Sequence, residues 1–198
     1  MTPLAIAALF SVALVAVVIL FVLVATYNDV IALERRIDKA WANIDVALKQ
    51  RWDELPNLVA AVRGVMTFEQ DVLTEVTRLR AEYSPRAPIA SQAETSEATS
   101  AALRQLFAVV ERYPVLRSQA NVLDLQNEIE RLENVIADRR ELYNDQVYRL
   151  NTTIAQVPAN SLAWLFDWRP RPFFSTSAAE RAIPGADLRR ASEAREGQ

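Results

Sequence analysis

The sequence has 198 residues, with 25 Asp and Glu against 22 Lys and Arg, and it contains neither His nor Cys. Their absence excludes zinc fingers, haem ligation by His, disulfides and imidazole bases. Only three glycines and a net charge of −3 also argue against glycine-rich phosphate-binding loops and against nonspecific nucleic-acid binding, so we expect no nucleic-acid partner.

The N-terminal stretch is apolar and predicts a membrane-spanning helix. Residues 4–24 read LAIAALFSVALVAVVILFVLV, and no charged side chain occurs before Asp29. A helix of roughly 20 residues crosses the hydrocarbon layer of a bilayer. A cleaved signal peptide would have a basic start and a shorter apolar core. We therefore expect residues 1–26 to be a single-pass anchor. Arg35, Arg36 and Lys39 favour a soluble domain on the cytoplasmic side.

Residues 27–158 have the apolar spacing of amphipathic helices, with charged residues on the outer positions. No stretch here alternates apolar and polar residues as a strand does. The first stripe consists of Leu33, Ile37, Trp41, Ile44, Leu48 and Leu55, and it continues through Leu58, Val62, Val65, Val72, Val76, Leu79 and Tyr83.

Two positions interrupt this first stripe. Pro56 favours a helix break or reversal because proline inside a helix costs ~3 kcal/mol; a single kinked helix is the alternative, which would leave a three-helix arrangement. Gly64, followed by a possible capping box from Thr67 to Gln70, is a weaker break point. Residues 84–100 contain two prolines and predict a loop, whose later part is helical if Ser91 caps the next helix.

The last long segment, residues 116–155, predicts one extended helix. Its stripe must pack on the earlier helices or on another chain, because an isolated amphipathic helix is not stable in water. Packing within the chain and a homo-oligomeric coiled coil are both open at this point. The stripe residues are Val122, Leu125, Ile129, Leu132, Ile136, Tyr143, Val147, Leu150 and Ile154.

An aromatic segment, residues 159–175, follows Pro158, and a polar tail that we expect to be disordered occupies 176–198. The segment either covers one end of the helical domain, lies at the membrane interface or binds a protein partner. A fourth antiparallel helix would return it toward the bilayer. The candidate contact residues are Trp164, Phe166, Trp168, Arg169, Arg171, Phe173 and Phe174.

Carboxylate pairs on the last long helix offer an alternative, metal-based function. Two pairs of carboxylates are three residues apart and so share a helix face: Glu130 with Glu133, and Asp138 with Glu141. Di-metal helical bundles use Glu-x-x-His motifs, however, and this chain has no His. We therefore expect no catalytic residue, no cofactor and no bound metal.

Several motifs in order resemble the bacterial LemA family. They are YNDVIALERRIDKAWANIDVALKQRWDELPNLVAAVRG at 27–64, ALRQLFAVVERYP at 102–114, LDLQNEIERLENVIADRRELYNDQVYRLNTTIAQVP at 123–158 and WLFDWRPRPFF at 164–174. The resemblance implies an antiparallel four-helix domain anchored in the bacterial inner membrane. It implies no established catalytic activity and no agreed ligand.

These observations together predict a non-enzymatic interaction or scaffold protein at the bacterial inner membrane, with the lipid bilayer and an unidentified protein as partners. The alternative is a lipid-organising or membrane-remodelling protein that uses the aromatic segment as a second bilayer contact.

Overall fold

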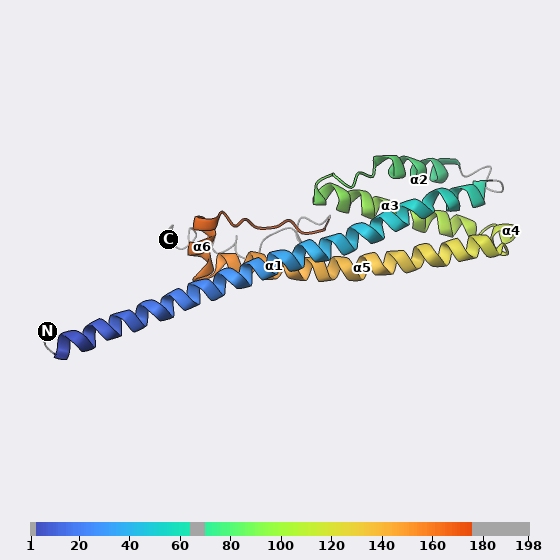
Figure 1. Cartoon of the computed structure of the whole chain (residues 1–198). Helices are drawn as coiled ribbons and strands as arrows, with labels where there is room; N and C mark the ends of the chain where they lie inside the picture. The colour runs from blue at the N-terminus through green and yellow to red at the C-terminus, as the bar shows by residue number, and fades with distance from the viewer. Residues whose placement is uncertain (1–2, 64–69, 176–198) are drawn as a thin grey trace, which may run out of the picture. The chain divides into compact units, whose positions relative to one another are not determined.

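The computed structural model describes residues 3–63 and 70–175, and within them it contains six α-helices and no strand. The predicted all-α class is confirmed. The expected disordered tail and the predicted capping box at Thr67 lie outside the described residues. The helices, labelled in Figure 1, are α1 (Pro3–Arg63), α2 (Gln70–Glu82), α3 (Ile89–Val110), α4 (Pro114–Arg117), α5 (Ala120–Ala155) and α6 (Ala159–Phe166).

Helix α1 contains the predicted apolar span. It is the one helix in the described part of the chain that is long and apolar enough to cross a membrane. No residue in its most apolar window is buried, and Leu4, Phe10 and Phe21 are each more than 70% exposed. A water-soluble protein does not leave so large an apolar surface uncovered. The apolar helix therefore fits a lipid environment.

The predicted reversal at Pro56 is wrong, since α1 continues through this residue to Arg63. The buried side chains on both sides of it, Leu55, Leu58, Val59 and Val62, keep one face of the helix in the core. Burial of these apolar side chains is favourable, and it offsets the free energy lost with the backbone hydrogen bond that proline removes. Helix α1 is described as far as Arg63, and α2 begins at Gln70.

The predicted loop at 84–100 is shorter than expected, because α3 already begins at Ile89. Ser91 is therefore inside the helix and does not cap it. The buried Gln92 donates from Nε2 to the carbonyl oxygens of Pro85 (3.3 Å) and Ala87 (2.9 Å). These bonds tie the turn between α2 and α3 to the first turn of α3. Figure 1 shows α2 and α3 side by side.

The chain divides into two compact units. Unit 2 contains residues 39–145 and 172–198. In it, α1 and α5 are antiparallel: the Trp41 and Tyr143 rings are 5.7 Å apart, and further along α1 the Arg51 guanidinium meets Glu133, which lies earlier in α5. Its core includes Ile44, Ala47, Leu48, Leu55, Leu58, Val62, Val76, Leu79, Leu103, Leu106, Leu116, Ile129, Leu132 and Ile136.

Unit 1 contains residues 1–38 and 146–171, and so combines the first part of α1 with the end of α5 and with α6. The predicted stripe on α5 is buried here as well. The buried apolar side chains of this unit are Val30, Ile37, Val147, Leu150, Ile154, Ala159 and Leu162.

Candidate functional site

The aromatic segment forms a short helix, α6, and then an extended strap, which we define as residues 168–175. Asp167 ends α6 in the left-handed conformation (φ 53°, ψ 38°), which Asp tolerates better than most residues. The Trp168 amide donates to the Ala163 carbonyl oxygen at 3.0 Å and closes the helix end. This turn separates the residues of α6 from those of the strap.

The side chains of α6 include a group of exposed apolar residues. Trp164 is 87% exposed, Leu165 64% and Phe166 47%, and Val157 just before the helix is 83% exposed. Leu162 is buried and holds the other face of α6 in unit 1. We call Val157, Trp164, Leu165 and Phe166 the aromatic patch.

The aromatic patch lies beside the point where the apolar span of α1 ends. In unit 1, the Tyr27 ring is 5.0 Å from the Phe166 ring and 5.8 Å from the Trp168 ring. Tyr27 follows Val24, the last residue of the apolar stretch, by three positions, which is roughly 4.5 Å along a helix. Tyr and Trp are the residues that gather at membrane–water interfaces.

The two arginines of the predicted site are both paired with carboxylates. Arg169 donates to Asp167 at 3.1 Å, and Arg171 donates to Asp38 on α1 at 3.0 Å. Both ion pairs are solvent-accessible, so each contributes little to stability. The second pair nevertheless joins the strap to α1 within unit 1.

Two asparagines of α5 hold the strap through its backbone. Asn151 accepts from the Arg171 amide (2.8 Å) and donates to the Arg171 carbonyl oxygen (3.0 Å). Asn144 makes the same pair of bonds with Phe174, at 2.9 and 3.3 Å.

Phe173 and Phe174, the last two predicted contact residues, are buried. Within unit 2, the Phe174 ring lies 5.7 Å from the Trp41 ring. The candidate contact residues, which the sequence places in one aromatic segment, therefore have different environments in the structure. Trp164 and Phe166 are exposed, Trp168 is half-buried, and the two strap phenylalanines belong to the core.

A fully buried arginine, Arg51, connects three helices of unit 2. Its Nη1 donates to Glu133 Oε1 on α5 (2.6 Å) and to Ser100 Oγ on α3 (3.0 Å). Its Nη2 donates to Ser96 Oγ (2.9 Å). Ser100 Oγ in turn lies 2.6 Å from Glu133 Oε2. Burial lowers the pKa of the Arg51 guanidinium, while the Glu133 carboxylate acts against that shift.

Two aromatic residues adjoin this arginine. The Arg51 guanidinium lies 5.4 Å from the centroid of Trp52, which stacks on Tyr83 at 4.9 Å. Tyr83 Oη is 3.4 Å from Asp45 Oδ1. Burial, with Asp45 as the second cause, raises the pKa of the Tyr83 phenol to about 12.

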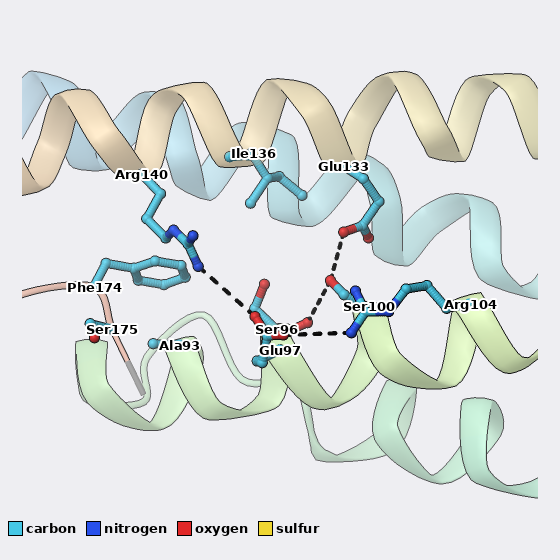
Figure 2. A pocket seen from close by; sticks show the side chains of 11 residues that line it. Ala93, Ser96, Glu97, Ser100, Arg104, Glu133, Ile136, Arg140, Phe174 and Ser175 are labelled. Atoms are coloured by element: carbon cyan, nitrogen blue, oxygen red, sulfur yellow. Dashed lines mark hydrogen bonds and ion pairs between the residues drawn. The ribbon is translucent and has the colours of Figure 1, made fainter. Parts of the chain in front are cut away.

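A polar cavity of about 260 Å³ lies between α3 and α5 and extends to the strap (Figure 2). It contains two arginines and two carboxylates. Glu97 faces Arg104 at 3.6 Å and Arg140 at 3.9 Å, while Glu133 reaches in from α5. The remaining lining residues are Ala93, Ser96, Ser100, Ile136, Ala137, Phe174 and Ser175.

The carboxylates considered for a metal site have separate environments. Glu133 bonds to Arg51, whereas Glu130 is exposed and accepts from Gln126; Asp138 and Glu141 are also exposed. Within residues 3–63 and 70–175, no group of three or more acidic residues is arranged to hold a metal ion.

Arg51 and Trp52 were missed as core residues, although the spacing contained the signal. Arg51 is three positions after Leu48 and four before Leu55, so it lies on the apolar stripe. Its charge indicated a solvated position. The hydrogen bonds that compensate for burying the Arg51 guanidinium come from residues 45 to 82 positions away in the sequence. A local sequence pattern does not reveal such distant partners.

Comparison with known proteins gives two findings. The profile of the LemA family matches residues 40–187, which is most of the chain. Magnetosome proteins MamQ 1 and MamQ 2 of Paramagnetospirillum magneticum (strain ATCC 700264 / AMB-1) are each 33% identical over 78 residues. That stretch is 39% of this chain and only 29% of either relative. The family match extends over three quarters of the sequence, and the chain belongs to the LemA family.

Proposed function

We propose that this protein is a single-pass scaffold of the bacterial inner membrane that presents a helical domain to a protein partner and catalyses no reaction. The observation that carries the proposal is the continuity of α1. One helix runs from the exposed apolar span at Pro3 to the buried residues around Leu58. A partner bound to the helical domain would thus be tethered to the membrane span through the chain of α1.

We also propose that the helices of unit 2 form an antiparallel four-helix bundle made of α1, α2, α3 and α5. Support comes from the contacts of Arg51, which reach α3 and α5, and from the stacking of Trp52 on Tyr83 beside α2. A bundle of this kind offers several outer helix faces to a partner. The soluble domain faces the cytoplasm in this proposal, because Arg35, Arg36 and Lys39 follow the span.

The relatives support a shared helical segment more than a shared role. The MamQ proteins are named for the magnetosome, but the matched stretch is 29% of their length. We therefore carry no partner over from them.

Photo-crosslinking in cells tests the scaffold function. A photoreactive residue placed at Leu142, which is exposed on α5, would capture a protein that binds the helical domain. We expect one recurrent crosslinked protein that is also recovered from a second site at Val46, exposed on α1. Crosslinks to abundant membrane proteins in proportion to their abundance, with none recurring at both sites, would contradict the proposal.

A lipid-organising role is the second candidate function, and the contact of Tyr27 with Phe166 favours it. The aromatic patch would then be a second bilayer contact of the same molecule, next to the end of the span. Wild type and a Trp164→Ala, Phe166→Ala variant would be reconstituted into vesicles of equal lipid composition. A protein-dependent change in vesicle size or curvature that the variant abolishes would support this role. Identical vesicles in both samples would exclude it.

A further inference from the structure

The cavity between α3 and α5 has a lining of mixed charge that no part of the scaffold function uses. Two guanidinium groups, Arg104 and Arg140, and two carboxylates, Glu97 and Glu133, face the same space, with serine hydroxyls between them. Figure 2 shows Arg140 and Phe174 on one side, Arg104, Glu133 and Ser100 on the other, and Glu97 between the two arginines. Charges of both signs therefore line one small space, with Arg140 and Glu133 on opposite sides of it.

The charged side chains at the mouth of this cavity form long, solvent-exposed ion pairs and no hydrogen bonds with each other. Glu97 is 3.6 Å from Arg104 and 3.9 Å from Arg140, and both separations exceed the length of a hydrogen bond. In the part of the chain that the structure describes, Glu97 is the acidic partner of both guanidinium groups. Their N–H donors are therefore available to a carboxylate, which arginine binds through paired hydrogen bonds.

The floor of the cavity differs from its mouth because it is fixed. Glu133 is held by Arg51, which is fully buried, and by Ser100, at 2.6 Å in both cases. Its side chain is still 28% exposed, so the carboxylate keeps acceptor capacity toward the cavity. Glu133 and Glu97 together can accept from an ammonium group.

We propose that this cavity binds a small zwitterion of the free amino acid class, with its carboxylate on Arg140 and its ammonium toward Glu97 and Glu133. A simple anion would meet two carboxylates, and a simple cation would meet two guanidinium groups. The volume of about 260 Å³ is below the roughly 300–1,000 Å³ of sites for drug-sized molecules. The proposal does not depend on the scaffold function.

Calorimetric titration and thermal unfolding of the full-length protein in detergent micelles test the site. The probes are glycine, L-alanine and L-serine, with acetate and methylamine as molecules that each carry one of the two charges. We expect saturable binding and a rise in Tm with at least one amino acid and with neither single-charge probe. No binding by any amino acid, or equal binding of acetate, would overturn the proposal.

Matched variants locate the binding. Arg140→Gln and Glu97→Gln each remove one charged contact and should weaken amino acid binding about tenfold to a hundredfold. Arg131→Gln and Glu128→Gln make the same changes in an exposed ion pair of α5 outside the cavity and should leave the affinity unchanged. An equal loss in all four variants would place the binding elsewhere. Unchanged Tm of the ligand-free variants shows that each one is folded.

Discussion

Arg51 and Glu133 show at the scale of single residues how the core is specified. Burying an ion pair is costly, and similar apolar side chains are often at least as stable. The ion pair contributes instead to the specificity of helix packing. Arg51 bonds to α3 and α5 at once, so it fixes how these helices meet α1. Truncating one partner leaves the other charge buried and unpaired.

Glu133→Gln is therefore expected to lower the free energy of unfolding by about 2–4 kcal/mol, since the Arg51 charge stays buried. The range is below that for a fully buried pair because the Glu133 side chain is 28% exposed. Urea unfolding of the full-length protein in micelles, followed by circular dichroism, measures the change. Glu128→Gln, which breaks an exposed pair, is the control and should change stability by about 0.5 kcal/mol or less. Equal effects of the two changes would contradict the structural role of Glu133.

Tyr83 gives a prediction about pH. Its folded-state pKa of about 12 lies above the usual value of 10.0, so the folded state holds the phenolic proton more tightly than the unfolded state. The stabilisation from Tyr83 is fully present below pH 10 and is lost as the pH rises toward 12. Wild type should therefore lose stability through this window more steeply than Tyr83→Phe. Parallel stability curves for the two proteins would refute the shift.

The residue scale also shows where sequence reasoning stops. The phase of Leu48 and Leu55 places Arg51 on the buried face, but a charged side chain is normally solvated. Its partners Ser96, Ser100 and Glu133 are distant in sequence. Burial of Arg51 thus depends on tertiary contacts that a one-dimensional pattern does not contain.

At the scale of whole helices, α1 shows that packing outweighs a local preference. Proline predicts a break, yet the apolar face on both sides of Pro56 is buried and the helix continues. The periodicity alone carried the correct information, because the stripe keeps its phase across the proline.

Replacing this proline should stabilise the helix. Pro56→Ala restores one backbone hydrogen bond, and we expect a gain of about 1–3 kcal/mol in the free energy of unfolding. Chemical denaturation of the full-length protein checks it. Ala60→Gly, a substitution on the same helix, should lower stability by about 1 kcal/mol and calibrates the assay. A loss of stability in Pro56→Ala would mean that the proline ring itself is required for packing.

The strap depends on its asparagine contacts. Asn151→Ala removes both hydrogen bonds to the backbone of Arg171 and should cost about 1–3 kcal/mol, because Asn151 is buried. Hydrogen exchange of the Arg171 amide should become faster in this variant. Asn151→Asp keeps the acceptor for that amide and should retain more of its protection. Unchanged exchange in Asn151→Ala would show that the strap is held by other contacts.

At the scale of the molecule, the helical class, the apolar span and the long stripe of α5 could be predicted, since each depends on local composition and period. The environment of the aromatic segment could not. Whether Trp164 or Phe174 is exposed depends on the turn at Asp167 and on the asparagines of α5. Composition places Trp164 and Phe174 in one aromatic segment, whereas the fold exposes Trp164 and buries Phe174.

The proposed attachment to the membrane requires that the aromatic patch of unit 1 lies at the membrane boundary where the apolar span of α1 ends. The chain contains no cysteine, so Trp164→Cys provides a unique site for an environment-sensitive fluorophore in reconstituted vesicles, and Leu14→Cys provides a reference inside the bilayer. We predict that lipid-attached quenchers at headgroup depth quench the label at position 164, that deeper quenchers act more strongly at position 14, and that aqueous iodide acts weakly at both. Iodide quenching at position 164 as strong as for free label, with no effect of lipid-attached quenchers, would contradict the account.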